Sequence, residues 1–456
     1  MKYDYVKGFI LIIGIVLLII VSAYFFNANK SGSSTAPTES TFISASSGTA
    51  QQQTTIKVYK SADTANKEIE NKLIDTFTAK TGIKVEFEVV PGDDIYKKIG
   101  IDLASSISTI DVIPLENPLP LDKFVKSDYL LPLNELLEAS NYDADAIHGK
   151  YLTKYNGETI YSLPINMTVW AVYYNKKIFD DAKVPYPPTE WTWAQYIDTA
   201  KKLTDPTKEI YGSYMLGFDT YLYMKARQHN ISAYKADGTS NYDDPILKES
   251  LKFFGDLGNV HKIQPNWLEY KTNNLQWDGF MTGKYGMHLV GSWYTGLLTD
   301  PTDYPKDWEW GVTQIPTDGK GTNTFGVTYT YAVNKLSTHP KEALEYVKFM
   351  AEYSAEIVGV LPALADPIAQ KNSIKHIAEL SEGSVTSEDL SKAFFDNNLG
   401  YVQEKNIGPS AAEYSNIILR EGTPYLNGQR SLEDTVKAIK EKADAVIQLE
   451  ISSKRY

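Results

Sequence analysis

Carboxylate and amide side chains follow two of the predicted strands, at positions suited to binding hydroxyl groups. Asp63 comes just after a predicted strand at 55–59, and Glu116 and Asn117 come directly after another at 110–115. In α/β lobes a ligand lies beyond the carboxyl ends of the strands, and planar carboxylate and amide groups pair well with hydroxyls. Asp63 could equally cap the helix that follows it, and Glu116 and Asn117 could lie in a solvated loop.

The common signatures of catalysis are missing from the sequence. The six histidines are scattered without an HExxH pattern, and there is neither a Gly-x-Ser-x-Gly elbow nor a GxxxxGK[ST] phosphate loop. The absence of cysteine excludes disulfides, thiolate metal sites and lipid attachment through an N-terminal cysteine. We therefore predict no enzymatic activity, no metal and no cofactor. The plentiful carboxylates leave a glycosidase pair open, but no barrel pattern of eight βα units appears.

Length and charge limit the architecture and the partners. The chain has 456 residues, and the part beyond its N-terminal segment is too long for one compact core, so two lobes are expected. The net charge is −12, and there are four arginines against 41 lysines. An acidic balance without a basic run argues against nucleic acid as a partner.

Strands and helices alternate along the first part of the folded region, which predicts parallel βαβ units and an α/β lobe. Farther along, a buried strand at 169–174 precedes a helix at 191–203 of period about 3.6. The expected elements are strands at 55–59, 83–90, 110–115, 169–174 and 324–334, and helices at 65–81, 94–106, 191–203, 340–353 and 432–449.

One ordered set of motifs resembles a known family. IYSLP begins at Ile160, YYNKKIF follows about nine residues later, and then come a Pro-Pro pair and the Thr-Trp of EWTW. In this order the motifs resemble the family 1 extracellular solute-binding proteins, the carbohydrate receptors of ABC importers. The resemblance runs from about residue 55 to about 365, and the last 90 residues carry no family motif that can be placed.

The resemblance implies a two-lobed, type II periplasmic-binding-protein-like α/β fold that binds a sugar or oligosaccharide by hinge closure and delivers it to permease subunits. The expected hinge strands lie near 165–168 and 314–319, where Pro or Gly stands beside extended residues. The expected lobes are 55–165 with 316–358, and 166–315 with 359–456. A monomer is expected; a binding protein for a non-sugar solute, or a surface polysaccharide-degrading enzyme, is the alternative.

The resemblance also implies ligand contacts. Thr168 falls near a position that often contacts ligand, and Trp293, in Gly-Ser-Trp, matches a position whose ring often stacks on sugar, with Tyr294 as the substitute. Trp170 could face the cleft or the core. The remaining candidates are Asp219 from the second lobe, and Thr328 and Tyr329 from the first.

The N-terminal segment reads as a membrane anchor. Phe9 to Phe26 is uncharged and just long enough to span a bilayer, and Lys2 and Lys7 before it place the remainder outside the cell. Three fates are open: an uncleaved anchor, a signal cut after Ala23, or a pilin-like signal cut after Gly8, and we favour retention of the helix. The predicted anchor is 1–26, and 27–54, rich in Ser and Thr, is predicted to be a disordered stalk.

Overall fold

The computed structural model describes residues 53–62, 67–91, 95–105, 108–319, 322–395 and 399–453. Residues from Gln53 onward form one compact unit. The predicted membrane helix, the predicted stalk up to residue 52 and the candidate Asp63 lie outside the described residues. Within the described ranges, no helix combines the length and the apolar character needed to cross a membrane.

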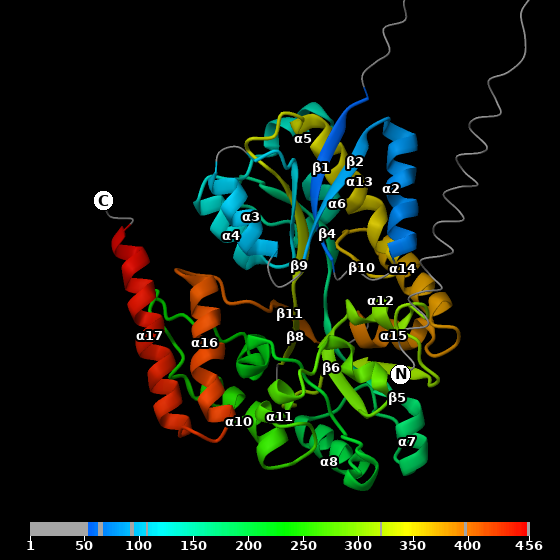
Figure 1. The fold of residues 1–456 in the computed structure, drawn as a ribbon, viewed down its shortest axis with the longest axis vertical. Helices are drawn as coiled ribbons and strands as arrows, with labels where there is room; N and C mark the ends of the chain where they lie inside the picture. The colour runs from blue at the N-terminus through cyan, green and yellow to red at the C-terminus, as the bar shows by residue number, and fades with distance from the viewer. Residues whose placement is uncertain are drawn as a thin grey trace, which may run out of the picture. The chain divides into compact units, whose positions relative to one another are not determined.

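A six-stranded sheet organises the first lobe, which we call lobe 1 (Figure 1). Its order is β10-β4-β9-β3-β1-β2, and β1 pairs in parallel with both β2 and β3, which confirms the predicted βαβ units. The other pairs, β3 with β9, β9 with β4 and β4 with β10, are antiparallel. The strands are β1 (Thr55–Ser61), β2 (Lys84–Val90), β3 (Val112–Leu115), β4 (Ser162–Met167), β9 (Thr328–Val333) and β10 (Leu361–Pro362).

Helices cover both faces of this sheet. On one face Phe77 of α2 packs against Tyr346 and Phe349 of α13. On the other face Ile99 of α3 and Phe124 of α4 share a second apolar cluster. The helices are α2 (Lys67–Thr81), α3 (Ile95–Ala104), α4 (Pro118–Lys126), α5 (Asn134–Ala139), α6 (Ala144–His148), η2 (Gly149–Tyr151) and α13 (Pro340–Val358).

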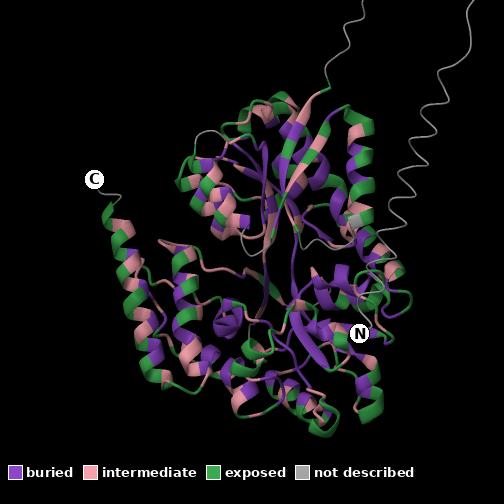
Figure 2. Cartoon of the chain, in the orientation of Figure 1, coloured by how far each residue is buried: buried purple, intermediate pink, exposed green. Residues whose placement is uncertain are grey.

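A three-stranded antiparallel sheet, β6-β5-β7, organises the second lobe, lobe 2. The strands are β5 (Trp170–Asn175), β6 (Met287–Gly291) and β7 (Trp310–Gln314), and all three are buried along their length (Figure 2). Because β5 is covered on both faces, it has no polar alternation, and its apolar run predicted it well. A short parallel pair lies beside it: β8 (Asn323–Gly326) and β11 (Gly400–Gln403).

Helices build most of the remaining structure. The Thr192 side chain and Gln195 form a capping box that starts α8, and α16 packs along α17. The elements are α7 (Lys176–Ala182), α8 (Trp193–Leu203), η3 (Pro206–Lys208), η4 (Asp219–Leu222), α9 (Met224–Gln228), α10 (Pro245–Asn259), α11 (Trp267–Thr272), η5 (Trp277–Thr282), α12 (Tyr294–Leu298), α14 (Pro367–Leu380), α15 (Ser387–Phe394), α16 (Ala411–Leu426) and α17 (Leu432–Ser453).

The chain passes between the large sheet and lobe 2 three times: at 168–169, at 327 and after β10, and the first two of these crossings are neighbours. Thr168 and Val169 join β4 of the large sheet to β5 of the small one, at the end of the predicted hinge 165–168. Val327 joins β8 to β9, so we place the second crossing there, later than the predicted 314–319 and the predicted boundary at 315/316. The two crossings touch, because the Thr168 amide donates to the Val327 carbonyl at 2.8 Å.

His288, in β6, is fully buried, and burial lowers its pKa to about 3 even though its ring bonds the Tyr214 carbonyl at 2.9 Å. The unfolded chain takes up this proton near pH ~6.5 while the folded protein does not, so stability falls as the pH drops below that value. We expect this site to cost about 2 kcal/mol between pH 7.5 and pH 5. Urea unfolding at both pH values checks this prediction. Between pH 7.5 and pH 5 the His288→Phe variant should lose about 2 kcal/mol less stability than the wild type. Equal losses in the two proteins would contradict the prediction.

Candidate ligand-binding cleft

The cleft wall of lobe 1 is a pocket of about 160 Å³ at the carboxyl ends of the parallel strands. β1 and β3 end here, β9 begins here, and α13 reaches the same place with its last turn. Polar, aromatic and aliphatic side chains line the pocket. Its lining includes Tyr59, Lys60, Ser61, Glu70, Phe87, Asn166, Tyr329 and Tyr331. Such a mixture offers hydrogen-bonding groups beside flat apolar faces.

An ion pair lies within this wall. Lys60 Nζ is 2.6 Å from Glu70 Oε2, and each side chain is 15% exposed. The ammonium of Lys60 also lies 4.9 Å from the centre of the Phe87 ring. The positive charge of Lys60 is therefore already balanced by a carboxylate within the wall.

Glu116 and Asn117 follow β3, as predicted, at the same edge of the sheet. The Glu116 amide donates to the Tyr96 hydroxyl at 2.6 Å, and burial together with the Glu116 carboxylate raises the pKa of Tyr96 well above its usual value. Asn117 is the N-cap of α4, because its side chain accepts from the Leu119 amide at 3.0 Å. This corrects the prediction for Asn117 of ligand contact or a solvated loop: Asn followed by Pro118 at the first helical position is a helix-start signal.

The crossing forms the floor between the lobes. Thr168 is 7% exposed, and Trp293, partly buried, lies beside it at the start of α12. A Cβ on Gly291 would lie 2.4 Å from Thr168 Cγ2 and 2.8 Å from Trp293 Cδ1, so both side chains occupy the space that this glycine leaves open. Thr295 of α12 donates to the Gly359 carbonyl at 3.4 Å. That carbonyl stands between two residues of the lobe 1 pocket, Val358 and Val360, so the pocket and the start of α12 are neighbours.

Thr328 and Tyr329 begin β9, next to the second crossing. Thr328 pairs with Met167 of β4, and Tyr329 lines the lobe 1 pocket. Burial, with the carboxylate of Glu116 as the next cause, raises the pKa of Tyr329 well above its usual value. The structure therefore brings Glu116, Thr168 and Tyr329 to one edge of the sheet; their contact with a ligand stays a prediction.

A charged network forms the facing wall of lobe 2. Lys405 Nζ lies 2.6 Å from Asp219 Oδ1 and 3.4 Å from Glu404 Oε1. Thr220 accepts from Lys405 at 3.0 Å and donates to Glu404 Oε1 at 2.7 Å. Asp219 Oδ2 accepts from the Tyr223 hydroxyl at 2.9 Å and also from Ser415. We call Asp219, Thr220, Glu404 and Lys405 the lobe 2 network.

Pairing keeps this network charged despite its burial. Burial disfavours the Asp219 carboxylate, but Lys405 and the hydroxyls of Ser415 and Tyr223 outweigh it, so the pKa of Asp219 lies below its ordinary value. Burial likewise disfavours the Lys405 ammonium, and the nearby Asp219 carboxylate raises the pKa of Lys405 well above its usual value all the same.

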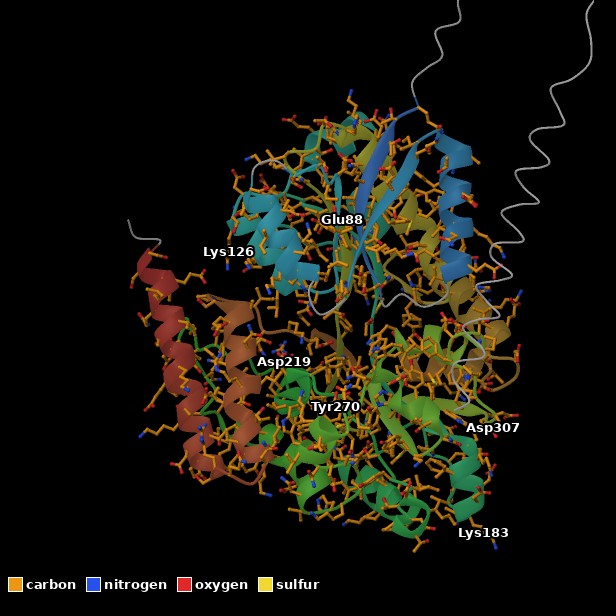
Figure 3. The ribbon with its side chains drawn as sticks, viewed as in Figure 1. Glu88, Lys126, Lys183, Asp219, Tyr270 and Asp307 are labelled. Atoms are coloured by element: carbon orange, nitrogen blue, oxygen red, sulfur yellow. The ribbon has the colours of Figure 1, made fainter. Side chains whose placement is uncertain are left out.

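The lobe 2 network faces lobe 1. Leu119, at the start of α4, shares a small cavity of about 10 Å³ with Asp219, Lys405 and Ser415. Figure 3 labels Asp219 in the part of lobe 2 nearest lobe 1. Lys126 of α4 also lies 3.6 Å from Glu450 of α17. Asp219 of lobe 2 therefore lies close to the start of α4 in lobe 1.

Two predicted site residues lie in the core instead. Trp170 is 2% exposed, with its ring against Tyr221 and Phe325, and its Nε1–H donates to Glu404 Oε2 at 2.7 Å. Tyr294 is fully buried, and its hydroxyl donates to the Trp277 carbonyl at 2.8 Å. We therefore remove both from the candidate site; Trp170 serves to hold Glu404.

Sequence reasoning missed Glu404 and Lys405. Both follow β11, whose pairing with β8 brings residues from the far end of the chain beneath the crossing. These two residues are an adjacent acid and base in a stretch without a recognisable motif. Nothing in that stretch of the sequence indicates that they lie near the crossing. Among the described side chains, no group of three or more His, Asp or Glu is placed to hold a metal ion.

Three known proteins that resemble this chain in sequence or in structure are named as binding proteins. A protein of Brucella abortus named only as a binding protein is 26% identical over 280 residues, 59% of this chain and 64% of that protein, a little under two thirds of its length. The arabinooligosaccharide-binding protein of Halalkalibacterium halodurans is 24% identical over 234 residues, 48% of each chain. An ABC substrate-binding protein of Listeria monocytogenes, solved in complex with cycloalternan, superposes with a TM-score of 0.75 at 22% identity, over 86% of this chain and 98% of that one.

The likeness to the Listeria structure supports the fold: two α/β lobes joined by crossing strands. Residues 61–356, more than half of the chain, match the family described as bacterial extracellular solute-binding protein. The match covers β3, β4 and β9 of lobe 1, the crossings at 168–169 and at 327, and the start of α12. This chain belongs to the bacterial extracellular solute-binding proteins.

Proposed function

We propose that this protein is the extracytoplasmic receptor of an ABC importer and that it captures a sugar or oligosaccharide in the cleft between its lobes. The observation that carries the proposal is the pocket at the carboxyl edge of the lobe 1 sheet, with Trp293 of lobe 2 beside it across the crossing. Hydroxyls of a sugar need polar partners and its ring faces need apolar ones, and this cleft offers both.

The relatives support the choice of a saccharide. One is named for arabinooligosaccharide, and another was solved with cycloalternan. A ligand that touches both lobes stabilises the closed arrangement, because that arrangement has the higher affinity. The closed receptor would then dock on the permease, and no chemistry on the ligand is needed, so we propose a binding protein and not an enzyme.

We further propose that Phe9–Phe26 anchors the protein to the outer face of the membrane and that the Ser- and Thr-rich segment after it serves as a stalk. A receptor of this kind would work as a monomer, with residues 55–165 and 166–315 contributing most of lobes 1 and 2. The proposed ligand contacts are Glu116, Thr168, Trp293, Thr328 and Tyr329, with Asp219 acting from the lobe 2 network; Asp63 remains a candidate.

Calorimetric titration of the full-length protein in mild detergent tests the function. The panel comprises maltotriose, arabinotriose, cellobiose and mannitol, with amino acids and a polyamine as non-sugar solutes. We expect heat of binding from at least one saccharide. Binding of a non-sugar solute with none from any saccharide would refute the assignment, and release of smaller sugars during the titration would identify an enzyme.

Trp293 is expected to stack on the bound sugar. Trp293→Ala removes a ring face and should weaken the best saccharide of the panel by about tenfold, or ~1.4 kcal/mol. Trp293→Phe keeps a flat ring and should retain most of the affinity. Thermal unfolding of both variants serves as the control, and a lower melting temperature of Trp293→Ala with unchanged affinity would show that the ring serves packing alone.

A further inference from the structure

Asn406, which follows β11, has a side chain that is only half satisfied. Its Oδ1 accepts from the Ala233 amide at 2.9 Å. Its Nδ2 is buried and has no acceptor among the residues that the structure describes. Turning the amide over would place Nδ2 against the Ala233 N–H, so that two donors would meet. Asn406 therefore keeps a buried donor that is costly to leave unpaired and that an acceptor from outside the protein can satisfy.

This side chain lines the small cavity that Leu119 of lobe 1 shares with Asp219 of lobe 2. The volume of the cavity is about 10 Å³, which is close to the space that one water molecule needs. A hydroxyl group of a sugar has nearly the same bulk as a water molecule. In this arrangement of the lobes the cavity can therefore take a single hydroxyl group, but not a whole sugar ring.

Asp219 supplies an acceptor in the same cavity. Its Oδ2 accepts from Tyr223 and Ser415, and its Oδ1 accepts from Lys405 at 2.6 Å. A carboxylate oxygen has two lone pairs, so Oδ1 has the capacity for a second donor. Because Asn406 and Asp219 line one cavity of this size, a group placed in it lies close to both. A donor and an acceptor together are the complement of a hydroxyl group, which accepts one hydrogen bond and donates another.

We propose, on the basis of the proposed saccharide function, that this cavity is the subsite for one hydroxyl group of the ligand and that Asn406 is a further ligand-binding residue. The hydroxyl oxygen accepts from Nδ2 of Asn406, and the hydroxyl O–H donates to Oδ1 of Asp219. A sugar without that hydroxyl leaves the buried Nδ2 unpaired. The subsite therefore determines specificity, because a site built to hydrogen-bond a hydroxyl rejects the analogue that lacks it.

Monodeoxy derivatives test the subsite by calorimetric titration of the full-length protein. The saccharide of the panel that binds best is compared with the derivatives that each lack one of its hydroxyls. We expect at least one derivative to bind at least about tenfold more weakly to the wild type than the parent does. If every derivative binds as tightly as the parent, the inference is wrong and the saccharide function still stands. If no saccharide binds at all, the proposed function falls, and this inference with it.

Variants of Asn406 then assign the sensitive hydroxyl to this residue. Asn406→Asp keeps an oxygen for the Ala233 amide but replaces the donor, so its affinity for the parent saccharide should fall by about tenfold. Removal of the sensitive hydroxyl should then cost this variant little more, because two groups that bind each other do not contribute additively. A deoxy derivative that loses the same factor in the variant as in the wild type would overturn the role of Asn406.

Two further variants complete the comparison. Asn406→Ala removes the donor without adding a charge and should show the same loss of coupling, so it tests the inference even if Asn406→Asp fails to fold. Asn416→Asp is the matched control, since Asn416 is exposed on α16 and donates to Glu413 at 3.4 Å. Its affinities should equal those of the wild type. Wild-type affinities in both variants of Asn406, with thermal unfolding confirming that they fold, would overturn the inference.

Discussion

Lys405→Met is expected to lower the free energy of unfolding by about 3–5 kcal/mol at neutral pH, the usual cost of breaking a buried ion pair. The Lys405 side chain is 13% exposed and that of Asp219 is 11% exposed. Without the ammonium, Asp219 keeps only the hydroxyls of Tyr223 and Ser415, and Glu404 keeps Trp170 and Thr220. Urea unfolding followed by tryptophan fluorescence measures the loss.

The loss should depend on pH in a defined direction. In the wild type the pKa of Asp219 lies below its unfolded value, so its stabilising contribution is present above pH ~4 and is lost as the pH falls through the folded value. In the variant, burial acts without Lys405 and raises the pKa of Asp219, so the carboxyl is protonated more easily. The difference between the two proteins should therefore be largest at pH 7 and shrink toward pH 4.

An exposed lysine provides the control for this variant. Lys177 pairs with Asp181 one turn away in α7, and both side chains are about 60% exposed. Exposed pairs of this kind contribute little, so Lys177→Met should leave the unfolding midpoint unchanged. A Lys405→Met protein as stable as this control would show that the lobe 2 network does not stabilise the fold.

Local sequence patterns predicted the elements whose conformation depends on their own residues. The alternating strand β1 and the periodic helix α17 both appear within a few residues of their expected bounds. The predicted strand 324–334 is instead two strands, β8 and β9, separated at Val327. The residues of this segment, TFGVTYTYAVN, have the pattern of one continuous strand. The break at Val327 arises because Thr168, from another part of the chain, packs against the segment. A contact between residues so far apart in the sequence leaves no periodic pattern in the residues of the strand.

The residues of the candidate site also fall into two groups: those that a local motif indicates, and those whose place depends on contacts with distant parts of the chain. The family resemblance singled out Thr168, by its distance from the YNK strand, and Trp293, in Gly-Ser-Trp, and the two side chains lie side by side at Gly291; their contact with a ligand stays a prediction. Trp170 stands in the same stretch, yet its ring turns to the core because Glu404, far along the chain, accepts from its Nε1. Asn117 carried a readable signal, Asn before Pro, for the helix cap that it forms. Glu404 and Lys405 carried none, since only the pairing of β11 with β8 places them.

Gly326 is the point at which the two crossings fit against each other. A Cβ there would lie 1.7 Å from the carbonyl oxygen of Thr168 and 3.2 Å from the ring of Tyr401. Gly326 also accepts from the Glu404 amide at 2.8 Å. Any side chain at this position must therefore push the first crossing away from the second or shift the segment that leads into the lobe 2 network.

Gly326→Ala should accordingly destabilise the protein by about 3 kcal/mol, the upper range for overpacking, because the obstructing atom belongs to the backbone and cannot rotate away. Saccharide affinity should fall as well, since the hinge and the floor of the cleft share Thr168. Gly100→Ala is the control: the nearest atom to its Cβ is Phe124 at 3.9 Å, and alanine favours the helix that contains it by up to ~1 kcal/mol. Thermal unfolding and calorimetric titration measure both quantities. Gly326→Ala and Gly100→Ala could instead have the same stability and the same saccharide affinity. That result would show that the crossing is looser than this contact implies, and that closure does not depend on the close approach of Gly326 to Thr168.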